Sequence, residues 1–203
     1  MSRPPSIPSK SRPALLLAAF LAAIQAGAQE QPSAEASTDL DIRTEWSRYD
    51  GALGRLVSTG VTIRQGDFEI TADRAETASL DFRNTTWLFS GNIRFRAGTA
   101  TLNCDEAELK FESGLTSAVI SGSPVTMLNE GTRVIKGSAR RVEYQAQSML
   151  VRFMGGAELD TGESRVNGES ITFDLNAETV TVAPGEGEPV QFLFEFLSPP
   201  DGS

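Results

Sequence analysis

The clearest pattern in the chain is an alternation of apolar and polar residues that begins at Trp87. Up to Phe95, almost every second residue is apolar, and this period of two is typical of a β-strand with one buried face. After a short turn and a second alternating run, the apolar positions change from even to odd numbers between Cys104 and Ala107. Such a change of phase indicates a bulge or corner, where the strand bends. The stretch 87–114 is therefore predicted to be strand, turn, strand, corner and strand.

This unit recurs along the chain. One glycine marks each copy, with steps of 31, 31 and 33 residues between Gly60, Gly91, Gly122 and Gly155. The corner recurs as a small residue that is followed three positions later by the change of phase. The predicted corner pairs are Ala72/Ala75, Cys104/Ala107, Gly137/Arg140 and Gly168/Ile171. A period of 31–33 residues predicts stacked supersecondary units that bury their apolar faces against one another.

The repeats predict an all-β protein. No segment after the N-terminal region reads as a helix, and four repeats of roughly four strands give about sixteen short strands plus a terminal one. The terminal candidate, VQFLFEFL at 190–197, is either a strand packed on the domain or an edge strand that awaits a partner. At the other end, the segment 40–49 is either a short strand or a helical turn, and its Trp46 and Tyr49 are predicted to cap the first repeat.

Composition excludes several classes of function. The chain has 203 residues, enough for one domain, and a formal net charge of −9, which argues against binding to nucleic acid phosphates. It contains no histidine, which excludes histidine metal ligands and an imidazole base. Its single cysteine excludes an intramolecular disulfide and a metal site built from several cysteines.

The N-terminus resembles a secretion signal. Basic residues precede an apolar run of 11 residues, Ala14–Ile24, which is too short to span a bilayer as a helix. Ala26-Gly27-Ala28 then supplies a cleavage site. Residues 1–28 are therefore predicted to be a signal peptide, with an uncleaved anchor as the alternative, and 29–55 a flexible lead-in and N-terminal cap. The expected compartment is the periplasm or the exterior.

Two groups of residues suggest reaction chemistry, and each also has a structural interpretation. Cys104 invites a nucleophile interpretation, but its repeat equivalents are small and histidine is absent, which favours a small hydrophobic corner residue. Asp105, Glu106 and Glu108 are either a metal or paired-carboxylate site or the wet outer edge of a corner.

Arginines and apolar residues suggest ligand binding instead. The arginines either contact the phosphates of an anionic lipid or place charge on exposed strands: Arg64, Arg94, Arg96, Arg140, Arg141 and Arg152. The apolar residues of the repeats are predicted to share one interior, which is either a packed core or a groove left open for acyl chains. Its proposed lining is Ile63, Phe68, Ile70, Phe89, Ile93, Phe95, Leu102, Leu109, Phe111, Met127, Tyr144, Phe153, Ile171 and Phe173.

Three stretches carry a resemblance to a known family. They are TGVTIRQGDFEITADRAE (59–76), SGNIRFRAGTATLNCDEAEL (90–109) and the block 135–175, with IKGSARRVEYQ at its start and NGESITFDL at its end. The first two resemble the glycine-led repeat of the OstA-like (LptA) family of lipopolysaccharide-transport proteins, and the third resembles that family's later block. The resemblance covers 56–182. It implies an open antiparallel β-jellyroll, or "β-taco", over 56–183, with a C-terminal strand and tail at 184–203.

The resemblance also implies a function. A protein of this family in the periplasm would bind lipopolysaccharide and shield the acyl chains of lipid A in the groove defined above, without enzymatic activity, cofactor or metal. Implied partners are an LptC-like inner-membrane relative, an LptD-like outer-membrane protein and further copies joined head to tail. The alternatives are a polymerising scaffold of β-repeats with a filled core and no lipid cargo, and a hydrolase that uses a pair of carboxylates.

Overall fold

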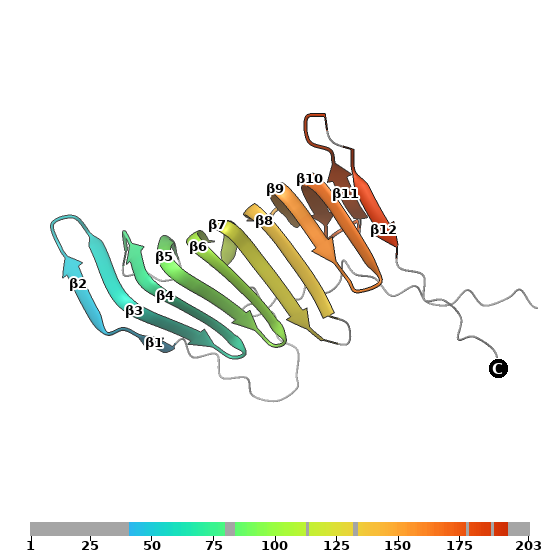
Figure 1. Ribbon diagram of the computed structural model, residues 1–203. Helices are drawn as coiled ribbons and strands as arrows, with labels where there is room; N and C mark the ends of the chain where they lie inside the picture. Colours follow the sequence, from blue (N-terminus) through green and yellow to red (C-terminus); the bar gives the residue numbers. More distant parts are fainter. Residues whose placement is uncertain are drawn as a thin grey trace, which may run out of the picture.

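The computed structural model describes residues 41–79, 84–112, 114–131, 134–177, 179–187 and 189–194. Over these residues the chain forms one antiparallel sheet of twelve strands and no helix. The strands are β1 (Asp41–Arg43), β2 (Trp46–Asp50), β3 (Arg55–Gln65), β4 (Phe68–Thr77), β5 (Asn84–Ala97), β6 (Ala100–Glu112), β7 (Leu115–Glu130), β8 (Val134–Gln145), β9 (Leu150–Asp160), β10 (Ser164–Asp174), β11 (Thr179–Ala183) and β12 (Gln191–Phe194). Figure 1 shows them side by side in chain order, from β1 and β2 at one end to β11 and β12 at the other. The predicted signal peptide, 1–28, lies outside the described residues.

The sheet is folded along a line that crosses the middle of its long strands. From β4 to β10, the register between neighbouring strands shifts at this line. In one such bulge, Ser90 pairs with Glu106 and Ile93 with Cys104, so two residues of β5 oppose one of β6. Bulges bend a strand, and their alignment bends the whole sheet. We call the two halves the first leg (46–59, 74–79, 84–90, 106–112, 114–121, 141–154, 170–177 and 179–183) and the second leg (41–43, 61–72, 93–104, 125–131, 134–139, 157–168 and 191–194).

The marker glycines of the repeats lie on this fold line. Gly60, Gly91 and Gly155 have φ angles of 57°, 76° and 80°, a left-handed conformation that glycine adopts readily. Gly122 lies within the register shift of β7, between Ser121 and Val125. The glycines therefore mark the middle of a bent strand and not the start of a repeat.

Each repeat is one hairpin of two long, bent strands: β3–β4, β5–β6, β7–β8 or β9–β10. The predicted all-β, open antiparallel jellyroll is confirmed. The sequence estimate of about sixteen short strands counted the two halves of a strand separately. The structure has fewer and longer strands because the backbone continues through each bend.

Burial locates the corners. In β6 the buried positions are even up to Cys104 and odd from Ala107, and β4 changes phase between Ala72 and Ala75 in the same way, as predicted. The third predicted corner, Gly137/Arg140, is wrong because Arg140 is exposed. The change of phase in β8 falls between Ala139 and Val142, which are both buried. Gly137 and Ala139 are both small and in phase, so residue size alone did not distinguish them.

The interior between the two legs, here called the trough, is filled by side chains from both. Buried apolar residues of all the long strands form one cluster. Phe153 and Phe173 meet edge to face with ring centroids 5.9 Å apart, and Trp87 stacks on Phe89 at 5.8 Å. The sheet therefore buries its apolar face against itself, which is what a single sheet needs in order to have a core.

Both edges of the sheet are split at the fold line. β1 and β2 pair with the two halves of β3, and Glu45 between them donates its backbone N–H to the Thr59 carbonyl at 3.0 Å. At the other edge, β11 and β12 pair with the two halves of β10. Residues 191–194 of the predicted terminal strand therefore pair with this same chain.

The segment 41–50 is strand, so the strand alternative for this region is correct. Trp46 and Tyr49 keep 53% and 49% of their surface exposed, because they lie on the outermost strand of the first leg. They lie on the strand that pairs with the first strand of the first repeat, and their role as a cap stays a prediction. Within the described residues, no helix is long and apolar enough to cross a membrane.

We expect the glycine at the bend of β5 to be more sensitive to substitution than the glycine at the following turn. A Cβ on Gly91 would lie 2.6 Å from Asp73 Oδ2, whereas a Cβ on Gly98 would meet nothing within 4 Å. Both Gly91→Ala and Gly98→Ala lose left-handed freedom, at a cost of about 1 kcal/mol. Gly91→Ala should lower the unfolding free energy by about 1 kcal/mol more, because Asp73 must move.

Urea unfolding followed by circular dichroism measures this difference. Equal midpoints for the two variants would contradict a tight contact across the fold line.

Candidate functional site

The structure brings the fourteen predicted groove residues together. All are buried in the trough except Phe111, which is partly buried and packs against the same cluster. The first leg contributes Phe89, Leu109, Phe111, Tyr144, Phe153, Ile171 and Phe173, and the second leg contributes Ile63, Phe68, Ile70, Ile93, Phe95, Leu102 and Met127. The two sets therefore form the facing walls of one trough.

Strand register arranges these residues in rows that run the length of the sheet. One row of the second leg is Ile42, Ile63, Ile70, Phe95, Leu102, Met127, Gly137, Leu159, Val166 and Phe192. One row of the first leg is Tyr49, Leu56, Thr77, Trp87, Leu109, Ala118, Tyr144, Val151, Phe173 and Val180. The second-leg row contains no polar side chain from one edge of the sheet to the other.

Sequence reasoning missed several lining residues, among them Trp87, Val151 and Leu159, which are all buried in the same cluster. Trp87 shares the odd-numbered alternation of Phe89, so that signal was available. Val151 shares the odd-numbered alternation of Phe153, so that signal was available as well. Leu159 follows the paired glycines at the bend of the fourth repeat, which interrupt the alternation, and its face could not be assigned without the register.

Cys104 is a buried corner residue. Only 6% of its surface is exposed. Burial raises its pKa to about 12, and the negative charge of Asp105 adds to the effect. A thiol with this pKa is almost wholly protonated at neutral pH and is a poor nucleophile. These observations support its interpretation as a small hydrophobic residue.

The acidic residues beside it lie on the outer surface. Glu106 and Glu108 are exposed, and Asp105 Oδ2 accepts a hydrogen bond from the backbone N–H of Ser123 at 2.9 Å. This contact joins the corner of β6 to the bend of β7. Within the described part of the chain, no three histidine, cysteine or acidic residues are grouped so as to hold a metal ion. The outer-edge interpretation fits this placement.

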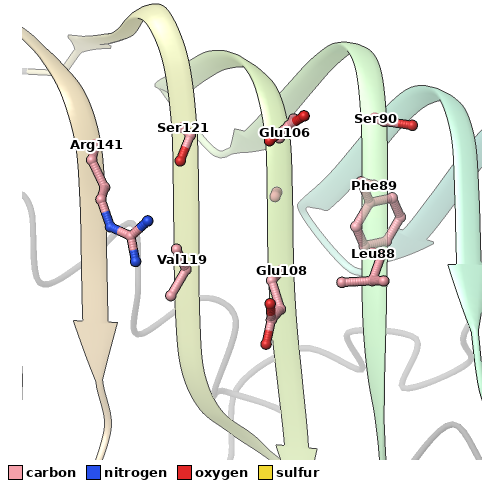
Figure 2. A pocket seen from close by; sticks show the side chains of 9 residues that line it. Leu88, Phe89, Ser90, Glu106, Glu108, Val119, Ser121 and Arg141 are labelled. Atoms are coloured by element: carbon pink, nitrogen blue, oxygen red, sulfur yellow. The ribbon is translucent and has the colours of Figure 1, made fainter.

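A shallow pocket of about 360 Å³ lies on the outer face of the first leg, over β5 to β8. Figure 2 shows Leu88, Glu108 and Val119 across its middle and Arg141 at one side. Arg141 is engaged by Glu143, with Nε 2.8 Å from the carboxylate. The sheet itself separates this pocket from the trough.

Most of the arginines highlighted by the sequence make contacts on the outer surface. Arg64 and Arg96 both lie beside Glu69, Arg94 donates to Asn103 Oδ1 at 3.2 Å, and Arg140 donates to the Gly155 carbonyl at 3.3 Å. These contacts support the interpretation that the arginines place charge on exposed strands.

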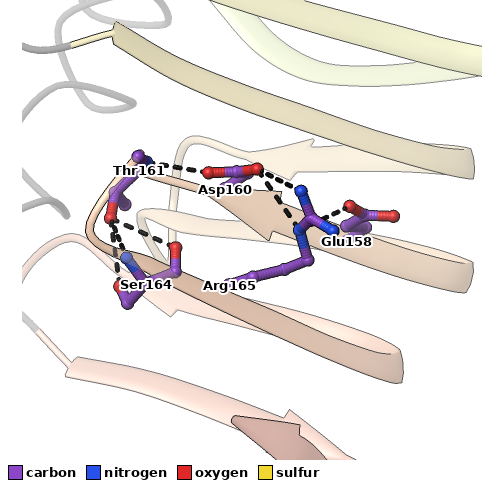
Figure 3. Close-up of polar contacts among 6 residues, drawn as sticks. Glu158, Asp160, Thr161, Ser164 and Arg165 are labelled. Carbon is purple, nitrogen blue, oxygen red and sulfur yellow. Dashed lines mark hydrogen bonds and ion pairs between the residues drawn. The ribbon is translucent and has the colours of Figure 1, made fainter. Parts of the chain in front are cut away.

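The turn between β9 and β10 is fixed in a similar way. In Figure 3, Arg165 contacts both Asp160 and Glu158, at 2.7 Å and 3.2 Å. The hydrogen bond from Arg165, together with one from the backbone N–H of Gly162, lowers the pKa of Asp160. The carboxylate therefore stays ionised at neutral pH and holds the turn at the tip of the second leg.

Comparison with known proteins identifies the family. The family described as LptA/(LptD N-terminal domain) LPS transport protein matches residues 74–179, which are 106 of the 203 residues. The chain belongs to this LptA/LptD N-terminal domain family. The OstA-like resemblance seen in the repeats is thereby confirmed.

Individual relatives are distant in sequence. Lipopolysaccharide export system protein LptA of Escherichia coli K12 is 22% identical over 135 residues, which are 61% of this chain and 73% of that protein. The LptA of Shigella flexneri gives the same values. A solved structure, LptH, is described as the LptA homologous periplasmic component of the lipopolysaccharide transport device of Pseudomonas aeruginosa. It aligns with a TM-score of 0.48 and 12% identity, covering 79% of this chain and 98% of that one.

We expect the thiol of Cys104 to resist modification in the folded protein. With a pKa of about 12, roughly one thiol in ten thousand is ionised at pH 8, and burial further excludes the reagent. Dithionitrobenzoate should react many-fold faster in urea than in buffer. The matched control is Asn103→Cys in a Cys104→Ala background, because Asn103 is the exposed neighbour on the same strand. Equal reaction rates at the two positions in buffer would contradict the buried corner.

Proposed function

We propose that this protein binds lipopolysaccharide in the periplasm without catalysing a reaction, and that the trough holds the acyl chains of lipid A. The observation that carries the proposal is the apolar row of the second leg, from Ile42 to Phe192, which continues from edge to edge of the sheet. Membership of a lipopolysaccharide-transport family supports the choice of ligand. The fourteen residues assigned above to the trough are the proposed lining.

Acyl chains need space that the free protein fills with its own side chains. Phe95, Phe173 and Ile93 are each 1% exposed, so the trough is closed in this state. Interiors of this kind are close-packed, and a chain of methylenes therefore enters only if the legs separate or the side chains rearrange. Each methylene then gains about 0.8 kcal/mol by leaving water. The gain offsets the cost of opening when several methylenes enter together.

The free energy gained per buried methylene also favours a row of similar troughs over a carrier that diffuses with its lipid. A lipid chain of about a dozen carbons would cost on the order of 10 kcal/mol to release into water. Transfer between two copies of one trough avoids most of this cost, because the environment of the chain hardly changes. We infer that copies of the protein stack end to end, with an LptC-like protein and an LptD-like protein at the ends of the stack.

The strand count of the sheet supports such stacking. Counting each split edge as one strand, the sheet has ten strand positions over the described residues: the two edges and the eight long strands between them. Neighbouring strands are antiparallel, so with an even number of positions the two edges run in opposite directions. The last edge of one copy can therefore pair antiparallel with the first edge of the next copy, with the first legs of the two copies in line. Such strand addition is a common mode of association.

The edges also carry apolar side chains that a neighbour would cover. Val180 ends the first-leg row and Phe192 ends the second-leg row, and both are substantially exposed. At the other edge, Tyr49 begins the first-leg row. Stacking would make the trough of one copy continuous with the trough of the next.

A polymerising scaffold without lipid cargo is the second candidate. The close packing of the trough favours it, because a filled interior is what such a scaffold needs. The two candidates differ in whether a lipid reaches the inner side chains.

Photo-crosslinking distinguishes these two functions. A benzophenone amino acid at Phe95 or Phe173 is expected to capture lipopolysaccharide, because both side chains lie in the trough. The same group at the adjacent outward positions Arg96 and Thr172 is the control. Capture at the outward positions and none at the inward ones would exclude acyl binding in the trough. Assembly without any capture would favour the scaffold.

We expect Val180→Asp to weaken end-to-end assembly, because it places a charge on the exposed edge of β11. Val134→Asp is the control, since Val134 is exposed to a similar degree, 49% against 43%, but starts an interior strand. Light scattering with and without lipopolysaccharide should show a smaller mean mass for Val180→Asp alone. Equal masses for the two variants would contradict stacking through this edge.

A further inference from the structure

Buried serine and threonine side chains are concentrated at one end of the trough. Within the described residues, four polar side chains are buried, and three of them are Ser58, Thr77 and Thr85. These three lie on β3, β4 and β5 in the first leg. The fourth, Asn129, accepts a hydrogen bond from Thr99 at the tip of the second leg.

The hydroxyls satisfy one another. Ser47 Oγ and Ser58 Oγ are 2.8 Å apart, and Thr77 Oγ1 and Thr85 Oγ1 are 2.6 Å apart. The hydroxyl of Thr77 also donates to the Ser79 carbonyl at 3.2 Å. Buried polar groups that are bonded to each other are stable in place. We call Ser47, Ser58, Thr77 and Thr85 the hydroxyl wall.

The same rows become apolar farther along the sheet. Ser47 and Ser58 are followed in their row by Ala75, Phe89, Ala107, Ile120, Val142, Phe153, Ile171 and Val182. Thr77 is followed by Trp87 and Leu109, and Thr85 by Phe111. The serine and threonine side chains of these rows therefore lie on β2 to β5, next to the apolar Tyr49, Leu56 and Ala75, and none follows them toward β11. The facing second-leg row is apolar throughout.

We propose that the hydroxyl wall weakens acyl binding beside β2 to β4, where the proposed lining comes from the second leg alone, so that acyl chains are held mainly between β5 and β11. The inference rests on the proposed function. A methylene gains stability by contact with apolar surface and little by contact with hydroxyls that already bond to each other. The protein thus has a strong-binding end and a weak-binding end. A lipid that passes between neighbouring copies crosses the weak end, beside β2 to β4.

In a stack, the weak end of one copy lies against the strong end of the next. The acyl-binding segments of successive copies are then separated by a hydroxyl-lined interval. A lipid moves in discrete steps from one segment to another instead of sliding along a uniform trough.

The test replaces hydroxyls by methyl groups without a change of shape. Thr77→Val/Thr85→Val removes both partners of one hydrogen bond, a change that is nearly neutral for stability when the shapes are kept, and it also removes the longer bond from Thr77 to the Ser79 carbonyl. It extends the apolar wall by two methyl groups. The control is Thr71→Val/Thr86→Val, the same change on the same two strands but at positions between the buried ones, on the outer face.

The probe is cis-parinaric acid, a fluorescent fatty acid, followed by stopped-flow release into vesicles of phosphatidylcholine. We expect roughly fifteen-fold slower release from Thr77→Val/Thr85→Val and the wild-type rate from the control, since each of the two added methyl contacts is worth about a factor of four. A second measurement uses a benzophenone amino acid at Leu56, which pairs with Thr77 from the neighbouring strand β3. Its crosslinking to the probe should be weak in the wild type and several-fold stronger in the variant.

Unchanged release together with unchanged crosslinking at Leu56 would overturn the inference while leaving the proposed function intact. No probe binding by the wild-type protein, together with no capture of lipopolysaccharide by the benzophenone variant at Phe173, would overturn both. If Thr77→Val/Thr85→Val fails to fold, Ser58→Ala replaces it, because Ser47 keeps a hydroxyl partner in Thr44 at 2.9 Å. The same slowing of release is then expected, to a smaller extent, and its absence would overturn the inference.

Discussion

The alignment of bulges along one line is the constraint on which this structure depends. An antiparallel sheet with a single apolar face must bury that face, and the chain supplies no helix among its described residues to cover it. Bending every long strand at the same level lets the sheet cover itself. The bends require residues such as Gly60 and Gly91 in a left-handed conformation, and a change of phase on the neighbouring strand. The burial of the apolar cluster follows from this line.

A bend could be predicted from the sequence where only one position for it kept the apolar residues on both sides facing inward. Between Cys104 and Ala107 the apolar positions change phase, and no other reading of that stretch keeps both halves facing inward. In the third repeat, Gly137 and Ala139 were equally acceptable, and the structure places the corner at Ala139. Long-range register decided between them, and a local pattern does not encode register. The same limit explains why half-strands were counted as strands.

The lining of the trough was readable to a similar extent. Apolar residues in phase with a strand had one interior to enter, so the fourteen chosen residues meet there. Trp87 was omitted although it shares the phase of Phe89. The hydroxyl wall was not foreseen, because serine and threonine are common on exposed strand faces and their phase alone carries little weight. Only the burial of Ser58, Thr77 and Thr85 shows that these three belong to the interior, and Ser47 joins them from the exposed edge strand through its bond to Ser58.

The close packing of the trough and its proposed use as a binding site act on the same residues. A side chain such as Phe95 or Phe173 stabilises the free protein by filling space that an acyl chain would occupy. A better-packed trough would therefore resist opening, and a looser one would lower the stability of the fold. Proteins with binding sites often balance these two demands. Here the balance lies within a single apolar cluster, since the described residues hold no separate core.

The split edges have a mechanical consequence. Because β1 and β2 are separate strands, and β11 and β12 are joined through 184–190, each leg ends in its own short edge. Two stacked copies would therefore be joined by two independent seams, each only a few residue pairs wide, whereas neighbouring long strands within a copy are joined along their whole length. Bending strain would concentrate at those seams. A filament of such units would be stiff within each unit and flexible at each joint. It could bend as the distance between its two ends changes, without opening any trough.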